Sequence, residues 1–312
     1  RSHPAGGAAV RRALLAGLLW FVVAPAQAQS CEASGVQLQV LGSGGPELYD
    51  RRASSSYLVW FNGKARVLID IGGGAALRFH EAGARVEDLD AILFTHLHVD
   101  HSADLPALIK ASWFGKRIEP LDIYGPHSNN LMPSTVTFVR TLFDKTRGAY
   151  RYLGDFLSPL DKTTYKLKPH DVPVKGNPPL TTFKLEHGRA QTAVVRHGAF
   201  PALAWRVEMG GKSVVISGDT NGDGDQLERL AKGADLLIAH NAVPEGAVGI
   251  ERSLHMPPSV IGQIAQTAQV KQLVLSHRMA RTLGKEDETL AAIKKKYEGP
   301  LAFANDLDCF KP

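Results

Sequence analysis

Four side chains that can bind metal ions lie within six residues of one another, at His96, His98, Asp100 and His101. They follow the apolar run 91–94, which is typical of a buried strand, so we expect the cluster to form a loop at the end of that strand. Histidine and carboxylate are ligands suited to zinc and to neighbouring transition metals. Because alternate residues of an extended segment face the same way, His96 and His98 can chelate one ion, whereas Asp100 and His101 point toward a second. A solvated polar loop is the alternative, but such clustering is rare in a chain with 12 histidines.

Further candidate ligands stand singly along the chain, each at the end of an apolar run. They are Asp70 before the glycines 72–74, His197 after 194–195, Asp219 after 214–216, and His277 after 273–275. A histidine or aspartate in such a place is usually only the polar boundary of a strand. Their order and their repeated position at strand ends give them weight as members of one site.

The cluster and these four strand ends, in this order, resemble the signature of the metallo-β-lactamase superfamily from about Val36 to Asp308. The resemblance implies an α/β fold of the αββα type, a sandwich of two mixed β-sheets flanked by helices. It also implies two zinc ions, with Mn²⁺ or Fe as alternatives. The implied roles are His96, His98 and His197 on the first ion, Asp100, His101 and His277 on the second, Asp219 bridging both, and Asp70 holding a ligand histidine or its loop from behind.

Apolar periodicity predicts the elements of such a sandwich within one domain, residues 29–312. Strands are expected at 36–40, 57–61, 67–71, 181–185, 191–195, 203–209, 213–217, 236–239 and 272–276, and helices at 75–82, 105–113, 225–232, 258–268 and 286–297. Residues 141–179 fit neither half of this pattern, and the Pro-rich part from 168 to 179 is expected to be irregular. We interpret the insert as a cap on the substrate side, with a plain surface connection as the alternative.

Residues 1–28 are predicted to be a cleaved signal peptide. Arg11 and Arg12 precede an apolar core at 13–24, and Ala26-Gln27-Ala28 forms a small-residue cleavage site. The apolar core is short for a membrane span, so an uncleaved anchor is the less favoured alternative. The expected location is therefore periplasmic or secreted, with no stable membrane anchor.

The mature chain is nearly neutral. Removing residues 1–28 takes away three arginines and no acid, which lowers the formal charge from +5 to +2. No polybasic run stands out, so binding of polyanions by bulk charge is not indicated, and we expect no nucleic-acid partner. A homodimer is compatible with the sequence.

The two cysteines, Cys31 and Cys309, stand at opposite ends of the mature chain and far from the metal motifs. They are not expected to bind zinc. In an oxidising compartment they could form a disulfide that ties the two ends together. A lipid anchor on Cys31 is the competing interpretation.

Flanking segments indicate a branch of the superfamily. The loop 41–46, of sequence Leu-Gly-Ser-Gly-Gly-Pro, the segment 217–220, and His255 ahead of an amphipathic helix resemble ribonuclease Z and its arylsulfatase and phosphodiesterase relatives. In that resemblance His255 lies near the leaving group, where an imidazolium could protonate a departing alkoxide. A surface histidine at a helix start is the alternative.

Two departures separate the chain from ribonuclease Z. That family has a His-Glu pair where this chain has His240 and Asn241, and the insert lacks a counterpart of its long basic arm. We therefore expect a hydrolase of a small phosphate or sulfate ester, attacked by hydroxide that the metal ions activate, with catalytic roles for Asp100, Asp219 and His255. The alternatives are a lactone, carboxylic ester or β-lactam hydrolase, or a metal-binding protein with little turnover.

Overall fold

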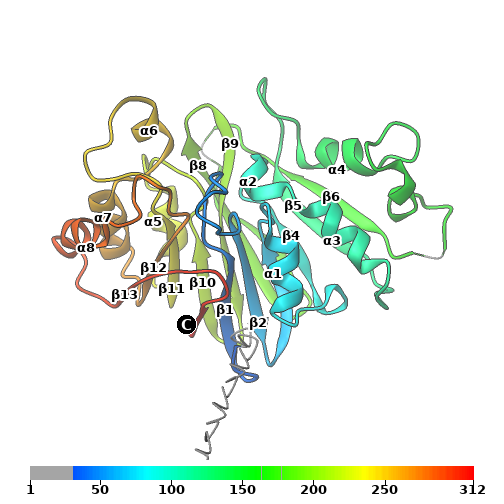
Figure 1. The fold of residues 1–312 in the computed structure, drawn as a ribbon, viewed down its shortest axis with the longest axis horizontal. Helices are drawn as coiled ribbons and strands as arrows, with labels where there is room; N and C mark the ends of the chain where they lie inside the picture. The colour runs from blue at the N-terminus through cyan, green and yellow to red at the C-terminus, as the bar shows by residue number, and fades with distance from the viewer. Residues whose placement is uncertain (1–30, 163, 177) are drawn as a thin grey trace, which may run out of the picture.

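Two β-sheets pack face to face in the computed structural model, which describes residues 31–162, 164–176 and 178–312 (Figure 1). The first sheet has the order β14 (Cys309–Phe310), β1 (Val36–Gly42), β2 (Ser56–Phe61), β3 (Lys64–Ile69), β4 (Ala91–Leu93), β5 (Leu121–Pro126), β6 (Leu167–Val172). The second has the order β13 (Leu301–Phe303), β12 (Leu273–Ser276), β11 (Leu236–His240), β10 (Lys212–Ile216), β9 (Phe200–Met209), β8 (Gly188–His197), β7 (Thr181–Lys184).

Both faces of each sheet are buried, and neighbouring residues of a strand enter different cores. On β2, Tyr57 and Val59 enter the core between the sheets, whereas Leu58 and Trp60 enter the core under the outer helices. This division follows from the alternation of side chains along a strand. It also explains why a central strand such as β4 is apolar without a break.

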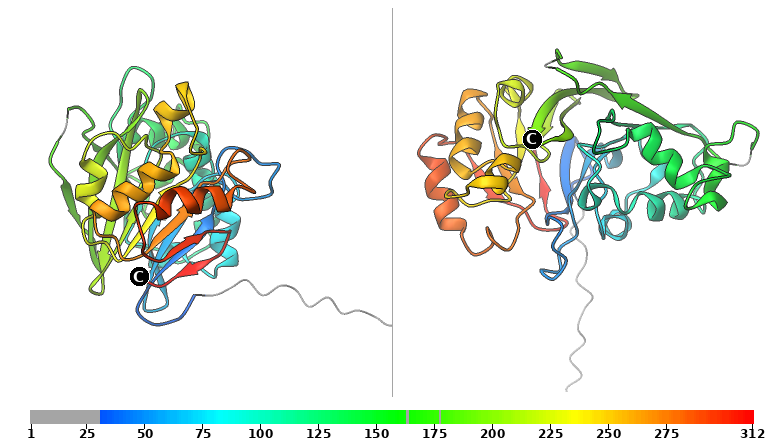
Figure 2. Two further views of the ribbon diagram at one scale, coloured as in Figure 1. Left: turned by 90° about the vertical axis from the view of Figure 1, so that its left-hand side faces the viewer. Right: turned by 90° about the horizontal axis from the view of Figure 1, so that it is seen from above.

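Helices cover the two outer faces, as the two views of Figure 2 show. Those on the side of the first sheet are α1 (Ala75–Glu81), α2 (Val99–Ser102), α3 (Leu105–Ser112) and α4 (Thr135–Phe143), with the 3₁₀ helices η1 (Val86–Asp88) and η2 (Arg151–Phe156). Those on the side of the second sheet are α5 (Gln226–Ala231), α6 (Gly249–Leu254), α7 (Pro258–Thr267) and α8 (Glu286–Lys294). The predicted αββα sandwich is confirmed.

The candidate ligands meet because of strand direction. β3, β4 and β5 are parallel to one another, and so are β10, β11 and β12. Parallel strands present their carboxyl ends at the same edge of a sheet, and residues that follow them are gathered there. The residues at this edge are Asp70 after β3, the 96–101 cluster after β4, Asp219 after β10, His240 at the end of β11, and His277 after β12.

The expectation that 168–179 is irregular was wrong for residues 168–172, which form most of β6. β6 is the outer strand of its sheet and pairs only with β5, with Pro169 in register with Ile123. A proline lacks an N–H donor, but an edge strand can tolerate it because one side of the strand needs no partner.

The rest of the insert packs on the outer helices of the first sheet. The Phe156 ring lies 5.7 Å from the Trp113 ring and 4.9 Å from the Tyr165 ring, and the Tyr165 hydroxyl is 2.7 Å from Ser112 Oγ. These contacts anchor the segment to the end of α3. Its role as a cap stays a prediction.

Cys31 and Cys309 form a disulfide, with Cα atoms 5.6 Å apart. The C-terminal strand β14 pairs with β1, and Phe310 lies opposite Leu38, so both ends of the described chain are held at one edge of the first sheet. The bond uses the Cys31 sulfur, which excludes the lipid anchor at that atom. The predicted signal peptide, residues 1–28, lies outside the described residues. Within the part of the chain that the structure describes, no helix has the length and apolar character needed to cross a membrane.

Replacing Cys31 and Cys309 together by alanine is expected to lower the free energy of unfolding by about 2–5 kcal/mol, because the bond restricts the unfolded chain. Urea denaturation of the oxidised protein and of the variant measures the difference. Reduced wild-type protein is the control and should match the variant. Equal stability of the oxidised and reduced wild type would contradict a stabilising bridge.

Candidate metal centre

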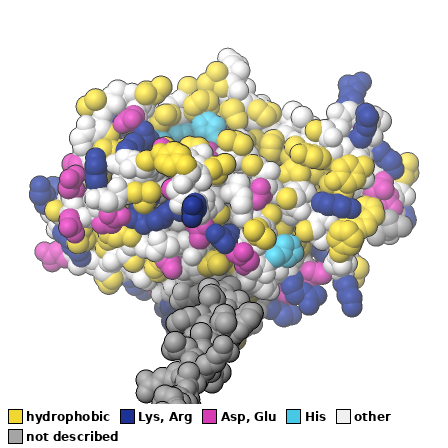
Figure 3. Space-filling model, viewed as in Figure 1, with side chains coloured by type: hydrophobic (Ala, Val, Ile, Leu, Met, Phe, Trp, Pro, Cys, Tyr) yellow, Lys and Arg dark blue, Asp and Glu magenta, His cyan; other side chains and the backbone are white. Residues whose placement is uncertain are grey.

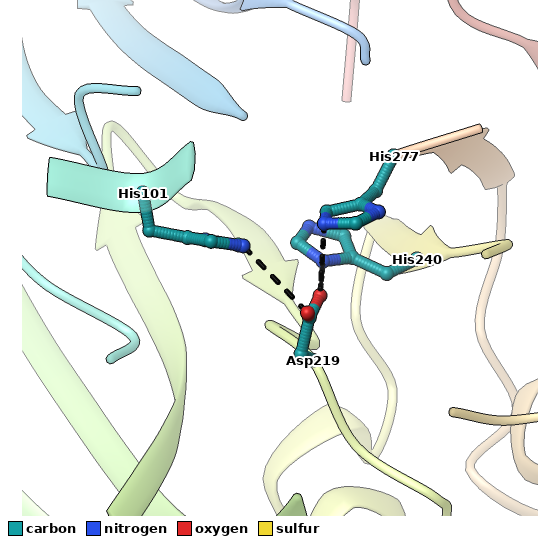
Figure 4. A group of neighbouring side chains, drawn as sticks. All are labelled: His101, Asp219, His240 and His277. Carbon is teal, nitrogen blue, oxygen red and sulfur yellow. Dashed lines mark hydrogen bonds and ion pairs between the residues drawn. The ribbon is translucent and has the colours of Figure 1, made fainter. Parts of the chain in front are cut away.

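The seven predicted ligands lie together at the edge where the strands end. The ring nitrogens of His96, His98 and His197 form one group, and the second contains atoms of His101, Asp219, His240 and His277; within each group, the candidate ligand atoms lie within 4.8 Å of one another. Figure 4 shows His101, His240 and His277 arranged around the Asp219 carboxylate. The side chains are buried except that of His98, which is half-buried.

Asp219 lies between the two groups. Its Oδ2 atom is 3.9 Å from His96 Nε2, 3.7 Å from His197 Nε2 and 3.7 Å from His101 Nε2. Its Oδ1 atom is 3.3 Å from His277 Nε2. The carboxylate therefore faces both groups of histidines, as a bridging ligand must.

Asp100 completes the second group. Its Oδ2 atom lies 3.4 Å from His101 Nε2 and 3.2 Å from His277 Nε2. The first turn of α2 carries Asp100, and the same helix carries His101, so one short helix delivers two of the predicted ligands.

The donor set fits metal ions. The Nε2 atoms of His96 and His101 are buried and have no hydrogen-bond partner among the described residues. Buried polar atoms are normally satisfied, and a cation accepts the lone pairs of several such nitrogens at once. Burial and the neighbouring histidines hold the pKa of His96 well below 6.5, which keeps its ring neutral as a metal ligand requires.

The pKa of His101 moves the other way. Burial lowers it, but Asp100, Asp70 and Asp219 outweigh burial and hold the pKa well above 6.5. The negative charge of these three carboxylates therefore favours a cation at this ring. A metal ion that binds His101 Nε2 must displace a proton, so binding there releases protons.

Asp70 fixes the orientation of the loop and of one histidine. Its carboxylate accepts hydrogen bonds from Thr95 N and Thr95 Oγ1, both at 2.7 Å, and lies 2.8 Å from His101 Nδ1. The Nδ1–H of His101 therefore points at Asp70, and Nε2 points at the cluster. The structure places Asp70 behind the candidate ligands, and its supporting role at a metal ion stays a prediction.

His197 is oriented in the same way by a backbone group. Its Nδ1 lies 2.9 Å from the carbonyl oxygen of Leu254, which is the last residue of α6. Nε2 is thereby turned toward Asp219. The end of α6 thus sets the direction of a candidate ligand at the end of strand β8.

A family model, the metallo-beta-lactamase superfamily, matches residues 49–252. The chain belongs to the metallo-β-lactamase superfamily. Among its curated relatives in that superfamily, ribonuclease Z of Mycobacterium sp. (strain KMS) is 31% identical over 262 residues, covering 78% of this chain and 84% of the relative. Ribonuclease Z of Mycobacterium bovis (strain BCG / Pasteur 1173P2) is 29% identical over 294 residues, covering 87% and 96%.

Solved structures of the superfamily share the fold. The metallo-beta-lactamase fold protein YhfI from Bacillus subtilis superposes with a TM-score of 0.69 at 21% identity, covering 89% of this chain and 99% of that one. The short form of human tRNase Z gives a TM-score of 0.65 at 20% identity, covering 88% and 98%. Zn²⁺-bound PqqB from Methylobacterium extorquens gives 0.62 at 16% identity, covering 88% and 100%.

His240 is a member of this superfamily site that the sequence analysis did not assign. Its Nδ1 lies 2.7 Å from Asp219 Oδ1, and its Nε2 lies 2.9 Å from the Tyr57 hydroxyl, which is 3.0 Å from Ser276 Oγ. Burial lowers the pKa of His240 to about 3, so the ring is neutral and donates from Nδ1 to the carboxylate. The available signal was its position directly after the apolar run 236–239, which ends as the other strand segments of the site do.

His255 lies at the site, but not as the imidazolium that the sequence suggested. Its Nδ1 is buried, has no hydrogen-bond partner among the described residues, and is 3.9 Å from Asp219 Oδ2. Burial lowers its pKa to about 4, which keeps the ring neutral near pH 7. Asn241 is also buried, and its Nδ2 donates to the carbonyl of Val243 at 3.4 Å.

Asp70→Asn is expected to weaken metal binding about 10–100-fold, because His101 loses the charged acceptor that orients it. Asparagine keeps the size of the side chain and tolerates the backbone φ of 56° at this position. Competition with a chelator measures the affinity. Asp122→Asn is the matched control, because Asp122 also faces a histidine, His170 at 2.7 Å, outside the cluster. Equal affinities in the wild type and Asp70→Asn would rule out the orienting role.

Proposed function

We propose that this protein is an exported hydrolase that uses two zinc ions to cleave a small phosphate or sulfate ester, with Mn²⁺ or Fe as the alternative metals. The observation that carries the proposal is the position of the Asp219 carboxylate between two groups of histidine nitrogens. A carboxylate in this position can be shared by two ions, and two-ion sites recur in phosphatases and nucleases.

In this proposal His96, His98 and His197 hold one ion, and Asp100, His101 and His277 hold the other, with Asp219 shared. When bound, two such ions lower the pKa of water and offset the charge that develops on the attacked ester. The remaining residues act on these ligands. Asp70 and the Leu254 carbonyl turn two histidines toward the centre, and His240 donates to Asp219 and holds its carboxylate in place.

Ester chemistry at phosphorus is favoured by the relatives. Their name, ribonuclease Z, denotes cleavage of RNA, whose backbone is a phosphodiester. RNA is therefore the second candidate substrate. A small ester is preferred because the sequence from residue 29 onward has a formal charge of only +2, and because Asn241 replaces the carboxylate of the His-Glu pair in ribonuclease Z.

A panel of substrates tests the proposal. We expect the metal-loaded protein to hydrolyse bis(p-nitrophenyl) phosphate or p-nitrophenyl sulfate faster than a lactone, and faster than precursor transfer RNA. Asp219→Ala should abolish nearly all of this turnover, because both ions lose their shared ligand, and elemental analysis should find fewer than two metal equivalents. Faster cleavage of the lactone or of RNA would replace the proposed substrate, and absence of turnover in a protein with both ions would favour a metal-binding role.

His255→Ala tests the leaving-group assignment. A neutral imidazole is a weak acid, so we expect a loss near about 10²-fold, the lower end for general acid catalysis, with esters of basic alcohols. Esters of p-nitrophenol should be spared because that leaving group needs no proton. Metal content, measured in parallel, should stay unchanged. Equal losses across the series of leaving groups would assign His255 a structural role.

Export is supported by the Cys31–Cys309 disulfide, because such bonds persist in oxidising compartments. N-terminal sequencing of the exported protein should find Gln29 as the first residue. An intact leader on the active protein would count against cleavage at this site.

A further inference from the structure

We propose that the substrate carries an apolar group next to its scissile bond, and that this group binds Val99, Leu131, Phe200 and Ile250, which we name the apolar rim. The inference rests on the proposed function for the nature of the ester. The four residues of the rim come from separate segments of the chain that lie beside the histidine cluster.

Phe200 and Val99 form the part of the apolar rim nearest the candidate ligands. The Phe200 ring lies 4.4 Å from the His98 ring and 5.9 Å from the His197 ring. Val99 directly follows His98 and is 70% exposed. A substrate atom bound at the first group of histidines therefore has apolar carbon atoms within reach.

Leu131 belongs to a loop that is fastened to the same place. The Asn129 side chain donates from Nδ2 to the carbonyl oxygen of Ala199 at 2.7 Å, and its Oδ1 accepts from the backbone N–H of Leu131 at 2.9 Å. These bonds hold Leu131 beside the turn that carries Phe200. Leu131 is nevertheless 58% exposed, so the described residues leave most of it uncovered.

Ile250 extends the apolar rim along α6. It lies one helical turn before Leu254 on α6 and therefore on the same face. The Leu254 side chain reaches the turn after His197, because a Cβ atom at Gly198 would lie 2.8 Å from Leu254 Cδ2. Ile250 is 75% exposed.

Large exposed apolar side chains are ordinary when they are scattered, but a contiguous group is typical of a binding site. Figure 3 shows the histidines reaching the surface near the top of the view, with hydrophobic side chains around them. The position of these residues beside the candidate active site indicates that the substrate is the occupant. A second protein would cover the histidines and block the reaction.

Two arginines near α6 are engaged within the protein rather than free for a polyanion. Arg252 donates to the carbonyl of Asn221 at 2.8 Å, and Arg281 donates to Glu251 at 2.7 Å. Binding of a nucleic acid depends on cations that neutralise its phosphates. The apolar rim therefore fits an ester with an alkyl or aryl substituent better than a strand of RNA.

The experiment uses a series of alkyl p-nitrophenyl phosphates with methyl, butyl and octyl groups, so that the leaving group stays constant. We expect kcat/KM of the metal-loaded protein to rise by up to about fourfold for each buried methylene. Ile250→Ser and Phe200→Ser should reduce the ratio of octyl to methyl ester at least about threefold, because each removes part of the contact.

Ile118→Ser is the matched control. Ile118 is 82% exposed, but it precedes β5 and so lies toward the opposite end of the sheet from the cluster. Its substitution should leave the octyl-to-methyl ratio unchanged. An equal fall of the ratio in Ile118→Ser would overturn the assignment to the rim.

A binding measurement separates this inference from the proposed function. Titration calorimetry with alkylphosphonates of the same chain lengths reports affinity without turnover. Tighter binding of octylphosphonate than of methylphosphonate, lost in Ile250→Ser, would support the apolar rim even if no ester in the panel were cleaved. The absence of cleavage would then count only against the proposed function. Affinity and kcat/KM that are independent of chain length, or displacement of octylphosphonate by an RNA oligonucleotide, would overturn the inference.

Discussion

A single buried carboxylate, that of Asp219, imposes the arrangement of the residues that follow the carboxyl ends of the parallel strands. A carboxylate removed from water is costly unless it is surrounded by donors and positive charge. Burial raises the pKa of Asp219, but His277, His101 and His255 outweigh it and hold the pKa well below 3.8. The group stays ionised in the interior because histidines from separate segments of the chain converge on it.

The sandwich provides that convergence. Asp219 comes from the second sheet, whereas His101 comes from the first, and the two meet only if the sheets pack with their parallel strands ending at the same edge. The contacts behind the ligands strengthen this link between sheets, since Tyr57 of β2 reaches His240 of β11. Packing of the core and geometry of the site are therefore one requirement, and a shift between the sheets would separate the ligands.

The sequence predicted most of this edge because its residues follow simple patterns. His96, His98, Asp100 and His101 are close in the chain, and each isolated ligand follows an apolar strand. His240 was not assigned, because its role depends on which strand lies between those of Asp219 and His277. The order in which strands pair cannot be predicted from a local sequence pattern.

Two further features depended on three-dimensional surroundings. The neutral state of His255 results from burial, which spacing cannot reveal. The sequence did not predict strand β6, because Pro169 argues against a strand unless that strand is known to lie at a sheet edge. Local composition thus predicted element types and the residues that gather at the site, while protonation and edge position required the assembled sheets.

The bond between Cys31 and Cys309 has a consequence for the lifetime of the protein. It joins residues separated by 278 positions and makes nearly the whole described chain a covalent ring. A protease that cuts one exposed loop of a linear chain produces two pieces that can diffuse apart, whereas a single cut in a ring only opens it. The disulfide keeps the two fragments of the cut chain linked. The two sheets, whose residues meet around Asp219, therefore keep a high effective concentration relative to each other. The fold is thereby protected against the first nick in any of its surface loops.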